Sequence, residues 1–307
     1  MAPPLAILLD TDIGTDVDDA IALALVLASP ELDLRSVTTV SGDVGLRARI
    51  AKKLLTLAGH DDVPVAAGVR EPVLRQRSFL WLGHEGKAIL DPSDTLSLAP
   101  THAVDALIEG VRRQHLHVVT IGPLSNVAVA IMKEPAVIQA IPHLTMMGGA
   151  LGLHPGGPLV EYNSGSDAEA SQIVLNAGMP VTLVPLDVTV QVALNANHLA
   201  RLRTSRSRLV QTVCEAIEIW APLHRRFFAS QPGWDTNTMA LLHDPLTVAV
   251  LIDPSFVTIE RHHLRPAIVA GDFRLVADPT AAELEVAVAV DAPRFVEFLI
   301  ERLLDLP

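Results

Sequence analysis

Short hydrophobic runs alternate with longer amphipathic segments along most of the chain. The runs are rich in Val, Ile and Leu and predict buried strands. They are Leu5–Leu9, Leu34–Val40, Val63–Ala67, His117–Ile121, Leu144–Met147 and Val181–Leu186. Segments with a helical pattern are Ala20–Ala28, Arg47–Ala58, Ala103–Arg113, Leu124–Met132, Asp167–Ala177, Ser207–Phe228 and Pro293–Leu304. This alternation is typical of a doubly wound α/β sheet whose strands are mostly parallel.

The last part of the chain departs from this alternation. We expect the Met239–Leu251 region to be helical in part and broken near Pro245. Shorter strands, expected to be antiparallel, are predicted near Val257–Arg261, Phe273–Val276 and Leu284–Val290. No change in composition marks a linker. We therefore predict one domain over residues 1–307, an α/β fold with an open, doubly wound, mixed but mostly parallel sheet flanked by helices.

Composition and charge narrow the classes of function. Half of the 307 residues are hydrophobic and 19% are charged, which allows a large core. The net charge of −12 argues against nucleic-acid or anionic-membrane partners, but not against a small neutral substrate. The single cysteine, Cys214, fits a reducing compartment. The start of the chain lacks the basic residues of a signal peptide, so a cytoplasmic location is expected.

Five aspartates lie within ten residues after the first predicted strand, in the stretch Asp10–Asp19. A helix cap at Thr15 or Asp16 would account for one or two polar residues there, but not for five acids. Clustered carboxylates repel one another unless a cation lies among them. Oxygen ligands without cysteine or histidine select Ca²⁺ or Mg²⁺ over zinc. The alternative is a solvated acidic turn.

The Asp10–Asp19 stretch resembles the N-terminal signature of the nucleoside hydrolase family, DxDxGxDD, with two extra residues between the glycine and the paired acids. Other segments resemble the family's motifs in the same order along the chain. They are Val37–Asp43, Ile121–Asn126, Met147–Gly149 with Glu161–Asn163, and Leu242–Pro245. The resemblance implies hydrolysis of the N-glycosidic bond of ribonucleosides, in purine or pyrimidine salvage, by a Ca²⁺-dependent enzyme that is commonly a dimer or tetramer.

The resemblance also implies roles for single residues. Asp12, Asp19 and Asp244 would bind Ca²⁺ through their side chains and Ile121 through its carbonyl oxygen. Asp12 would also take a proton from the attacking water. Residues implied to contact the sugar are Asp18, Asp43, Glu161 and Asn163, with Met147 packing near it. Asp10 would orient the acidic stretch from behind.

The leaving base needs a proton, and a histidine suits this task because its ordinary pKa lies near neutrality. His243, beside Asp244, is the candidate. The Trp81–Lys87 segment resembles a family loop that closes over the base, so Trp81 could stack on the base and His84 could touch it. Aromatic residues that could line the same pocket are Phe227, Phe228 and Trp234.

The sequence departs from the family pattern at two further places. The His154–Pro158 stretch lacks an asparagine that the family often has there. Asp43 stands where many members carry asparagine. Both differences concern the choice of substrate more than the metal.

Plainer interpretations remain for several of these residues. Asp244 and Pro245 also make a good helix start, and His243 could be an ordinary half-buried histidine. Glu161 and Asn163 could be loop polars and Met147 a core residue. The 81–87 segment could be a surface loop anchored by its tryptophan.

Two other functions fit parts of the pattern. A Mg²⁺-dependent phosphohydrolase of the haloacid dehalogenase type also begins with a strand and an Asp-x-Asp pair. It needs a lysine after a later strand, and none of the four lysines, Lys52, Lys53, Lys87 and Lys133, is convincingly placed. A nucleoside-binding protein without turnover would keep the metal, but the presence of both Asp12 and His243 speaks against it.

Overall fold

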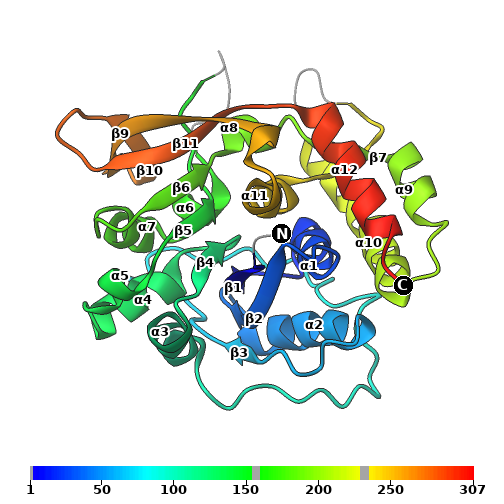
Figure 1. The fold of residues 1–307 in the computed structure, drawn as a ribbon. Coiled ribbons are helices and arrows are strands. Elements are labelled where there is room, and N and C mark those ends of the chain that lie inside the picture. Colours follow the sequence, from blue (N-terminus) through cyan, green and yellow to red (C-terminus); the bar gives the residue numbers. More distant parts are fainter. Residues whose placement is uncertain (1–2, 154–159, 229–234) are drawn as a thin grey trace.

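A nine-stranded sheet runs through the molecule (Figure 1). The computed structural model describes residues 3–153, 160–228 and 235–307. Its strands are β1 (Leu5–Thr11), β2 (Leu32–Thr39), β3 (Val65–Ala67), β4 (His117–Thr120), β5 (Leu144–Met147), β6 (Val181–Val184), β9 (Val257–Val269), β10 (Asp272–Ala277) and β11 (Glu283–Val290). The order across the sheet is β10-β9-β11-β6-β5-β4-β1-β2-β3. In this order, all neighbouring strands between β11 and β3 pair in parallel. The pairs β11–β9 and β9–β10 are antiparallel.

Two hydrophobic cores cover the two faces of the sheet. Successive side chains of a strand point to opposite faces. Ile7 and Leu9 of β1 accordingly enter one core, and Leu8 enters the other. The first core contains residues of α1 (Asp18–Leu27), α2 (Val44–Leu57), α9 (Ala196–Leu202), α10 (Arg208–Phe228), α11 (His243–Ile252) and α12 (Ala292–Leu304). The second contains residues of α3 (Ala103–Gln114), α4 (Ser125–Lys133), α5 (Val137–Ala140) and α7 (Ala168–Leu175). Figure 1 shows the first set to the right of the sheet and the second to its left.

The predicted α/β class, with a mixed and mostly parallel sheet flanked by helices, is confirmed. The prediction for Met239–Leu251 is wrong in detail. β8 (Thr238–Leu241) pairs with β7 (Ala193–Asn195), and α11 follows without a break. Pro245 lies in the first turn of α11, where its missing N–H breaks no helical hydrogen bond.

Some elements are too short for a sequence period to predict. They are α6 (Tyr162–Ser166), α8 (Leu186–Thr189), β7 and the 3-10 turn Pro254–Phe256. The long strand β9 was predicted at less than half its length. Its outer part, Leu264–Val269, pairs with β10 at the edge of the sheet, and the four polar residues 260–263 interrupt the hydrophobic pattern before it. Within the described residues, no helix is long and apolar enough to cross a membrane.

The strand order determines where a ligand can enter. From β1 the chain winds outward through β2 to β3, and then crosses back to β4 on the other side of β1. The segments that leave the carboxyl ends of β1 and β4 therefore diverge. Such a switch point is the usual ligand site of an open α/β sheet. The acidic stretch follows β1, and Ile121 follows β4.

Candidate active site

Residues 12–17, which we call the acid loop, join β1 to α1. Gly14 has a φ of +120° and a Cβ there would lie 2.7 Å from the Ile50 side chain, so both conformation and space require glycine. The prediction that Thr15 or Asp16 caps α1 is wrong. The N-cap is Val17, which has no side-chain cap bond, and Asp16 accepts a hydrogen bond from the Val17 N–H at 2.6 Å.

Three carboxylates meet at the end of the acid loop, and we call Asp18, Asp19 and Asp244 the acid group. One oxygen from each lies within 4.8 Å of the others. Their exposed fractions are 3%, 3% and 4%. The Asp244 N–H donates to Asp18 at 3.2 Å, and the Thr11 hydroxyl donates to Asp19. Burial, followed by repulsion from neighbouring aspartates, raises the pKa of all three well above its usual range. Such a set of buried oxygens fits a hard divalent cation.

Asp12 lies beside the acid group, and its charge raises the pKa of Asp19 and Asp244. Burial raises the pKa of Asp12 itself, while the Arg47 guanidinium opposes this shift. Gly122 lets the segment after β4 approach, because a Cβ there would lie 2.8 Å from the Asp12 nitrogen and Oδ1. The three carboxylates of the acid group include Asp18, whereas the family resemblance implied Asp12 as a ligand. The division of ligand and sugar roles among these acids stays a prediction.

The Met147, Glu161 and Asn163 side chains lie on the β4–β5 side of the site. Glu161 caps α6 by accepting from the N–H groups of Asn163 at 2.5 Å and Ser164 at 2.8 Å. The Asn163 amide donates to the Ile121 carbonyl at 3.1 Å, and it lies 3.5 Å from the Met147 sulfur. All three side chains are buried. Burial raises the pKa of Glu161, against the effect of the N–H groups that it accepts from.

Asp10 is buried in β1, two residues before the acid loop, and its role in orienting the loop stays a prediction. Its Oδ1 accepts from the Thr38 hydroxyl at 2.6 Å and the Asn126 amide at 2.7 Å, which joins β1 to β2 and α4. Burial raises the pKa of Asp10 to about 7.

His243 is half-buried at the start of α11, and its Nδ1 lies 2.7 Å from the Thr189 hydroxyl. Burial lowers the pKa of His243 to about 4, with a further contribution from His224. The alternative that Asp244 caps this helix is wrong, because the N-cap is Leu242 and Asp244 lies in the first turn.

Aromatic rings form one wall near the acid loop. His84 stacks on Trp220, with ring centroids 5.8 Å apart, and Trp220 also contacts His224 and Phe227. His84 Nε2 lies 2.9 Å from the Thr15 carbonyl oxygen. A small cavity between α1, the 84–89 segment and α10 is lined in part by Asp16, His84 and Trp220.

Sequence reasoning missed Trp220 and His224. Their spacing of four residues on one helix was a usable signal.

The remaining predicted residues are placed less directly. Trp81 is 39% exposed, and its ring lies over the Arg47 guanidinium. The distance from Arg47 Cζ to the centroid of the Trp81 ring is 5.2 Å. Asp43 is exposed and caps α2 by accepting from the Leu46 N–H at 3.0 Å, so its sugar contact stays a prediction. The His154–Pro158 stretch and Trp234 lie outside the described residues, and of Phe228 only the backbone is described.

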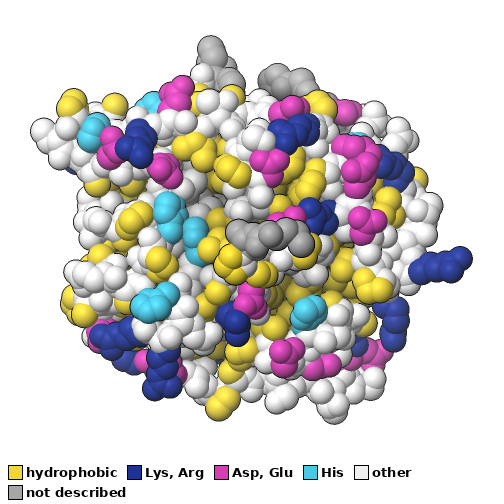
Figure 2. All heavy atoms as spheres, viewed as in Figure 1, with side chains coloured by type: hydrophobic (Ala, Val, Ile, Leu, Met, Phe, Trp, Pro, Cys, Tyr) yellow, Lys and Arg dark blue, Asp and Glu magenta, His cyan; other side chains and the backbone are white. Residues whose placement is uncertain are grey.

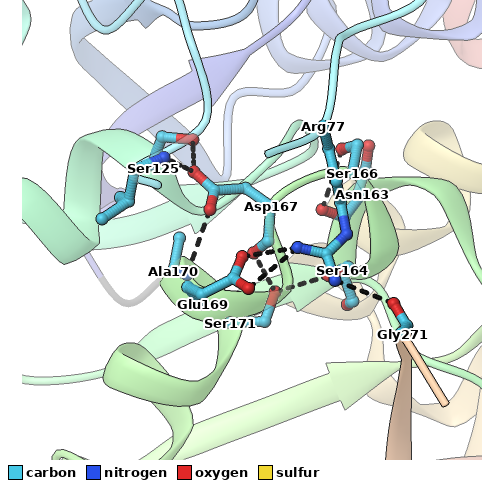
Figure 3. Close-up of polar contacts among 11 residues, drawn as sticks. Arg77, Ser125, Asn163, Ser164, Ser166, Asp167, Glu169, Ala170, Ser171 and Gly271 are labelled. Atoms are coloured by element: carbon cyan, nitrogen blue, oxygen red, sulfur yellow. Dashed lines mark hydrogen bonds and ion pairs between the residues drawn. The ribbon is translucent and has the colours of Figure 1, made fainter. Parts of the chain in front are cut away.

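The segment that leads to Trp81 is tied to α7, as Figure 3 shows. Arg77 forms an ion pair with Glu169 at 2.6 Å and donates to the Gly271 carbonyl at 2.8 Å. Asp167 accepts from the Ser125 hydroxyl at 2.6 Å and from the Val73 N–H at 3.0 Å. These contacts hold the 73–77 segment, which has no helix or strand, against the edge of the site.

Comparisons with known proteins all identify nucleoside hydrolases. The model of the family described as inosine-uridine preferring nucleoside hydrolase matches residues 7–297. The pyrimidine-specific ribonucleoside hydrolase RihA of Citrobacter koseri is 33% identical, over 97% of this chain and 98% of that protein.

Solved structures agree in fold. A plant nucleoside hydrolase superposes with a TM-score of 0.85 at 29% identity, over 99% of this chain and 100% of that one. A purine-preferring ribonucleoside hydrolase from Gardnerella vaginalis gives a TM-score of 0.85 at 28% identity, over 98% of both chains. Family membership removes the basis for the phosphohydrolase interpretation. The chain belongs to the inosine-uridine preferring nucleoside hydrolase family.

Proposed function

We propose that this protein hydrolyses the N-glycosidic bond of ribonucleosides with one Ca²⁺ ion at the acid group. The residues proposed to hold this ion are Asp12, Asp19 and Asp244, with the Ile121 carbonyl. The observation that carries the proposal is the meeting of Asp18, Asp19 and Asp244 at the switch point of the sheet. Three buried carboxylates that repel one another need a counter-charge. Their donor atoms are all oxygen, which favours a hard ion. When bound, the cation would hold the attacking water, lower its pKa and grip the ribose hydroxyls.

Asp12 is proposed as the base that accepts the proton of this water. It lies beside the acid group, and its buried carboxylate has a raised pKa, which makes it a better proton acceptor than an exposed aspartate. The surrounding carboxylates stabilise the positive charge that develops on the ribose in an oxocarbenium-like transition state. Asp18, Asp43, Glu161 and Asn163 are proposed to hydrogen-bond the sugar, and Met147 to pack near it.

His243 is proposed as the acid that protonates the leaving base. Its pKa of about 4 means that about one ring in a thousand is protonated at pH 7 in the free protein. The protonated ring is correspondingly a strong acid, and its Nδ1 contact with Thr189 orients it. Trp81 and His84 are proposed to cover the base. The relatives' names include both pyrimidine-specific and purine-preferring enzymes, so the preferred base is a matter for assay.

Three further expectations belong to this proposal. The protein would act in nucleoside salvage in the cytoplasm, as a homodimer or tetramer formed from single-domain chains. On the face shown in Figure 2, lysine and arginine side chains are scattered among acidic ones and form no single patch. A neutral nucleoside needs no such patch.

The test is a reducing-sugar assay over a panel of purine and pyrimidine nucleosides. We expect ribose release that stops after chelation and returns with Ca²⁺. Asp244→Asn should bind Ca²⁺ weakly and release little ribose, whereas Asp43→Asn, at the family's usual residue, should stay active. Binding of a nucleoside without hydrolysis over long incubation would instead support the non-catalytic alternative.

A further inference from the structure

Arg47 is the largest of the fully buried side chains, with an exposed fraction of 0%. It lies in the first turn of α2, directly behind the acid loop. Burying a guanidinium is unfavourable unless its donors find partners and its charge is compensated. Neither the ligand set nor the sugar contacts proposed above use this residue.

The donors of Arg47 converge on two neighbouring loops. Nε donates to the Ser41 carbonyl at 2.6 Å. Nη1 donates to the carbonyls of Asp12 and Ile13, the latter at 2.9 Å. Nη2 donates to the Thr15 hydroxyl at 3.0 Å. These acceptors are backbone carbonyls and a hydroxyl, so the side chain holds the path of the loops after β1 and β2 while the carboxylates stay open.

The position of these contacts matches an unusual feature of the acid loop. The loop is two residues longer between Gly14 and the acid pair than the pattern DxDxGxDD. Arg47 contacts it on both sides of Gly14, at Asp12 and Ile13 before the glycine and at Thr15 after it. A longer loop has more conformations to lose, and this fork of donors restricts them.

The same residue reaches the segment proposed to cover the base. The Trp81 ring lies over its guanidinium at 5.2 Å. The Thr15 hydroxyl accepts from Arg47 and donates to buried Glu85 at 3.4 Å, and Glu85 accepts from the Leu82 N–H at 2.7 Å. A continuous chain of contacts therefore links α2, the acid loop and the 81–87 segment.

We propose that Arg47 is a positioning residue that presets the acid loop for the cation and joins it to the 81–87 segment. The inference rests on the proposed function, because it needs a cation at the acid group. In this proposal the hydrogen bonds from the Arg47 guanidinium fix the geometry of the acid loop, which a positive charge alone would not do. Lysine keeps the charge but cannot reproduce the planar fork.

The main test compares Arg47→Lys with Arg49→Lys, a control on the same helix. Ca²⁺ binding is measured by calorimetry, and kcat and KM by ribose release at saturating Ca²⁺. We expect Arg47→Lys to weaken Ca²⁺ binding and lower kcat by about tenfold or more each, because groups that orient metal ligands have effects of this size. Arg49→Lys should stay within about twofold of wild type.

A second variant covers the case in which Arg47→Lys fails to fold. Thr15→Val keeps the shape and removes the hydroxyl between Arg47 and Glu85. We expect it to weaken Ca²⁺ binding by about threefold or more, and the double variant to be no worse than Arg47→Lys alone if that variant folds, because both act through one contact chain.

Four results bear on the inference, and three of them would overturn it. Wild-type Ca²⁺ affinity and kcat in folded Arg47→Lys would overturn it, as would a Thr15→Val variant with unchanged affinity. A lower Tm with unchanged Ca²⁺ affinity would mean a merely structural role and would overturn it too. A wild-type protein that neither binds Ca²⁺ nor releases ribose would instead refute the proposed function itself.

Discussion

Two sets of buried carboxylates at the same edge of the sheet have opposite surroundings. Asp167 accepts from a hydroxyl and from the N–H groups of Val73 and Ala170, and nearby Glu169 is paired with Arg77. Burial raises the pKa of Asp167, and its hydrogen bonds oppose the shift. In the acid group, aspartates face other aspartates, and repulsion adds to burial.

This difference distinguishes acids that stabilise the fold from acids that are available to bind a ligand. A carboxylate whose lone pairs are filled by the chain needs nothing more. A group of carboxylates with few donors is unfavourable in the folded protein without a cation, and such arrangements are concentrated at functional sites. Four measurements test whether these two sets of carboxylates have different roles.

The largest effect is expected from Asp12→Ala. We predict that this change removes the base, lowers kcat by about a thousandfold or more and weakens Ca²⁺ binding. Ribose release at saturating Ca²⁺ measures the first effect and calorimetry the second. Asp62→Ala, at an exposed acid outside the site, is the comparison for a loss of charge alone. Near-normal turnover in Asp12→Ala would refute the assignment.

His243→Ala should give a smaller and substrate-dependent loss. Nucleosides with poor leaving groups need a proton on the base, so their kcat should fall by about a hundredfold or more. p-Nitrophenyl riboside has a good leaving group and should lose far less. The ratio of the two losses is the measurement. Equal losses on both substrates would show that His243 is not the acid.

Asp167→Asn tests the other side of the comparison. Replacing this hydrogen-bonded acid should lower the free energy of unfolding by about 1–3 kcal/mol, because a donor is placed where the chain offers donors. Denaturant titration measures this loss. Ca²⁺ affinity should remain within about twofold of wild type. A large loss of Ca²⁺ affinity in Asp167→Asn, with an unchanged free energy of unfolding, would contradict a purely structural role for Asp167.

The fourth measurement is the pH dependence of stability. Asp10 has a pKa of about 7 in the fold, against 3.8 for the ordinary group. A raised pKa gives stability that is present below the unfolded value and is lost as pH rises through the folded value. His117, whose pKa is lowered to about 4 by burial, acts in the opposite direction between pH 4 and 6.5.

Without Ca²⁺, raising the pH from 4 to 7 should therefore lower the Tm of Asp10→Asn less than it lowers the Tm of wild type. Ca²⁺ should raise the Tm of wild type more at pH 8 than at pH 5, since protons and metal compete for the acid group. A Ca²⁺ effect independent of pH would contradict a site built from these carboxylates.

Much of the architecture was predictable because it depends on local periods. The run Leu5–Leu9 and the pattern of Ala20–Ala28 reported a buried strand and a helix within a few residues of their bounds. The prediction failed where tertiary pairing overrode the pattern, as at β8, or where an element was too short to repeat its period, as at α6. The density of acids after β1 predicted a candidate metal site there.

The order of most strands and helices, the family and the acids after β1 could be recognised from the sequence. The contact of Asp244 with Asp18, 226 positions earlier in the chain, and the burial of Arg47 beneath the acid loop appear only in the folded chain. The physical reason is that local periodicity follows from the geometry of one strand or helix. Contacts between distant segments depend on the order in which the strands pair and on how the helices pack across them.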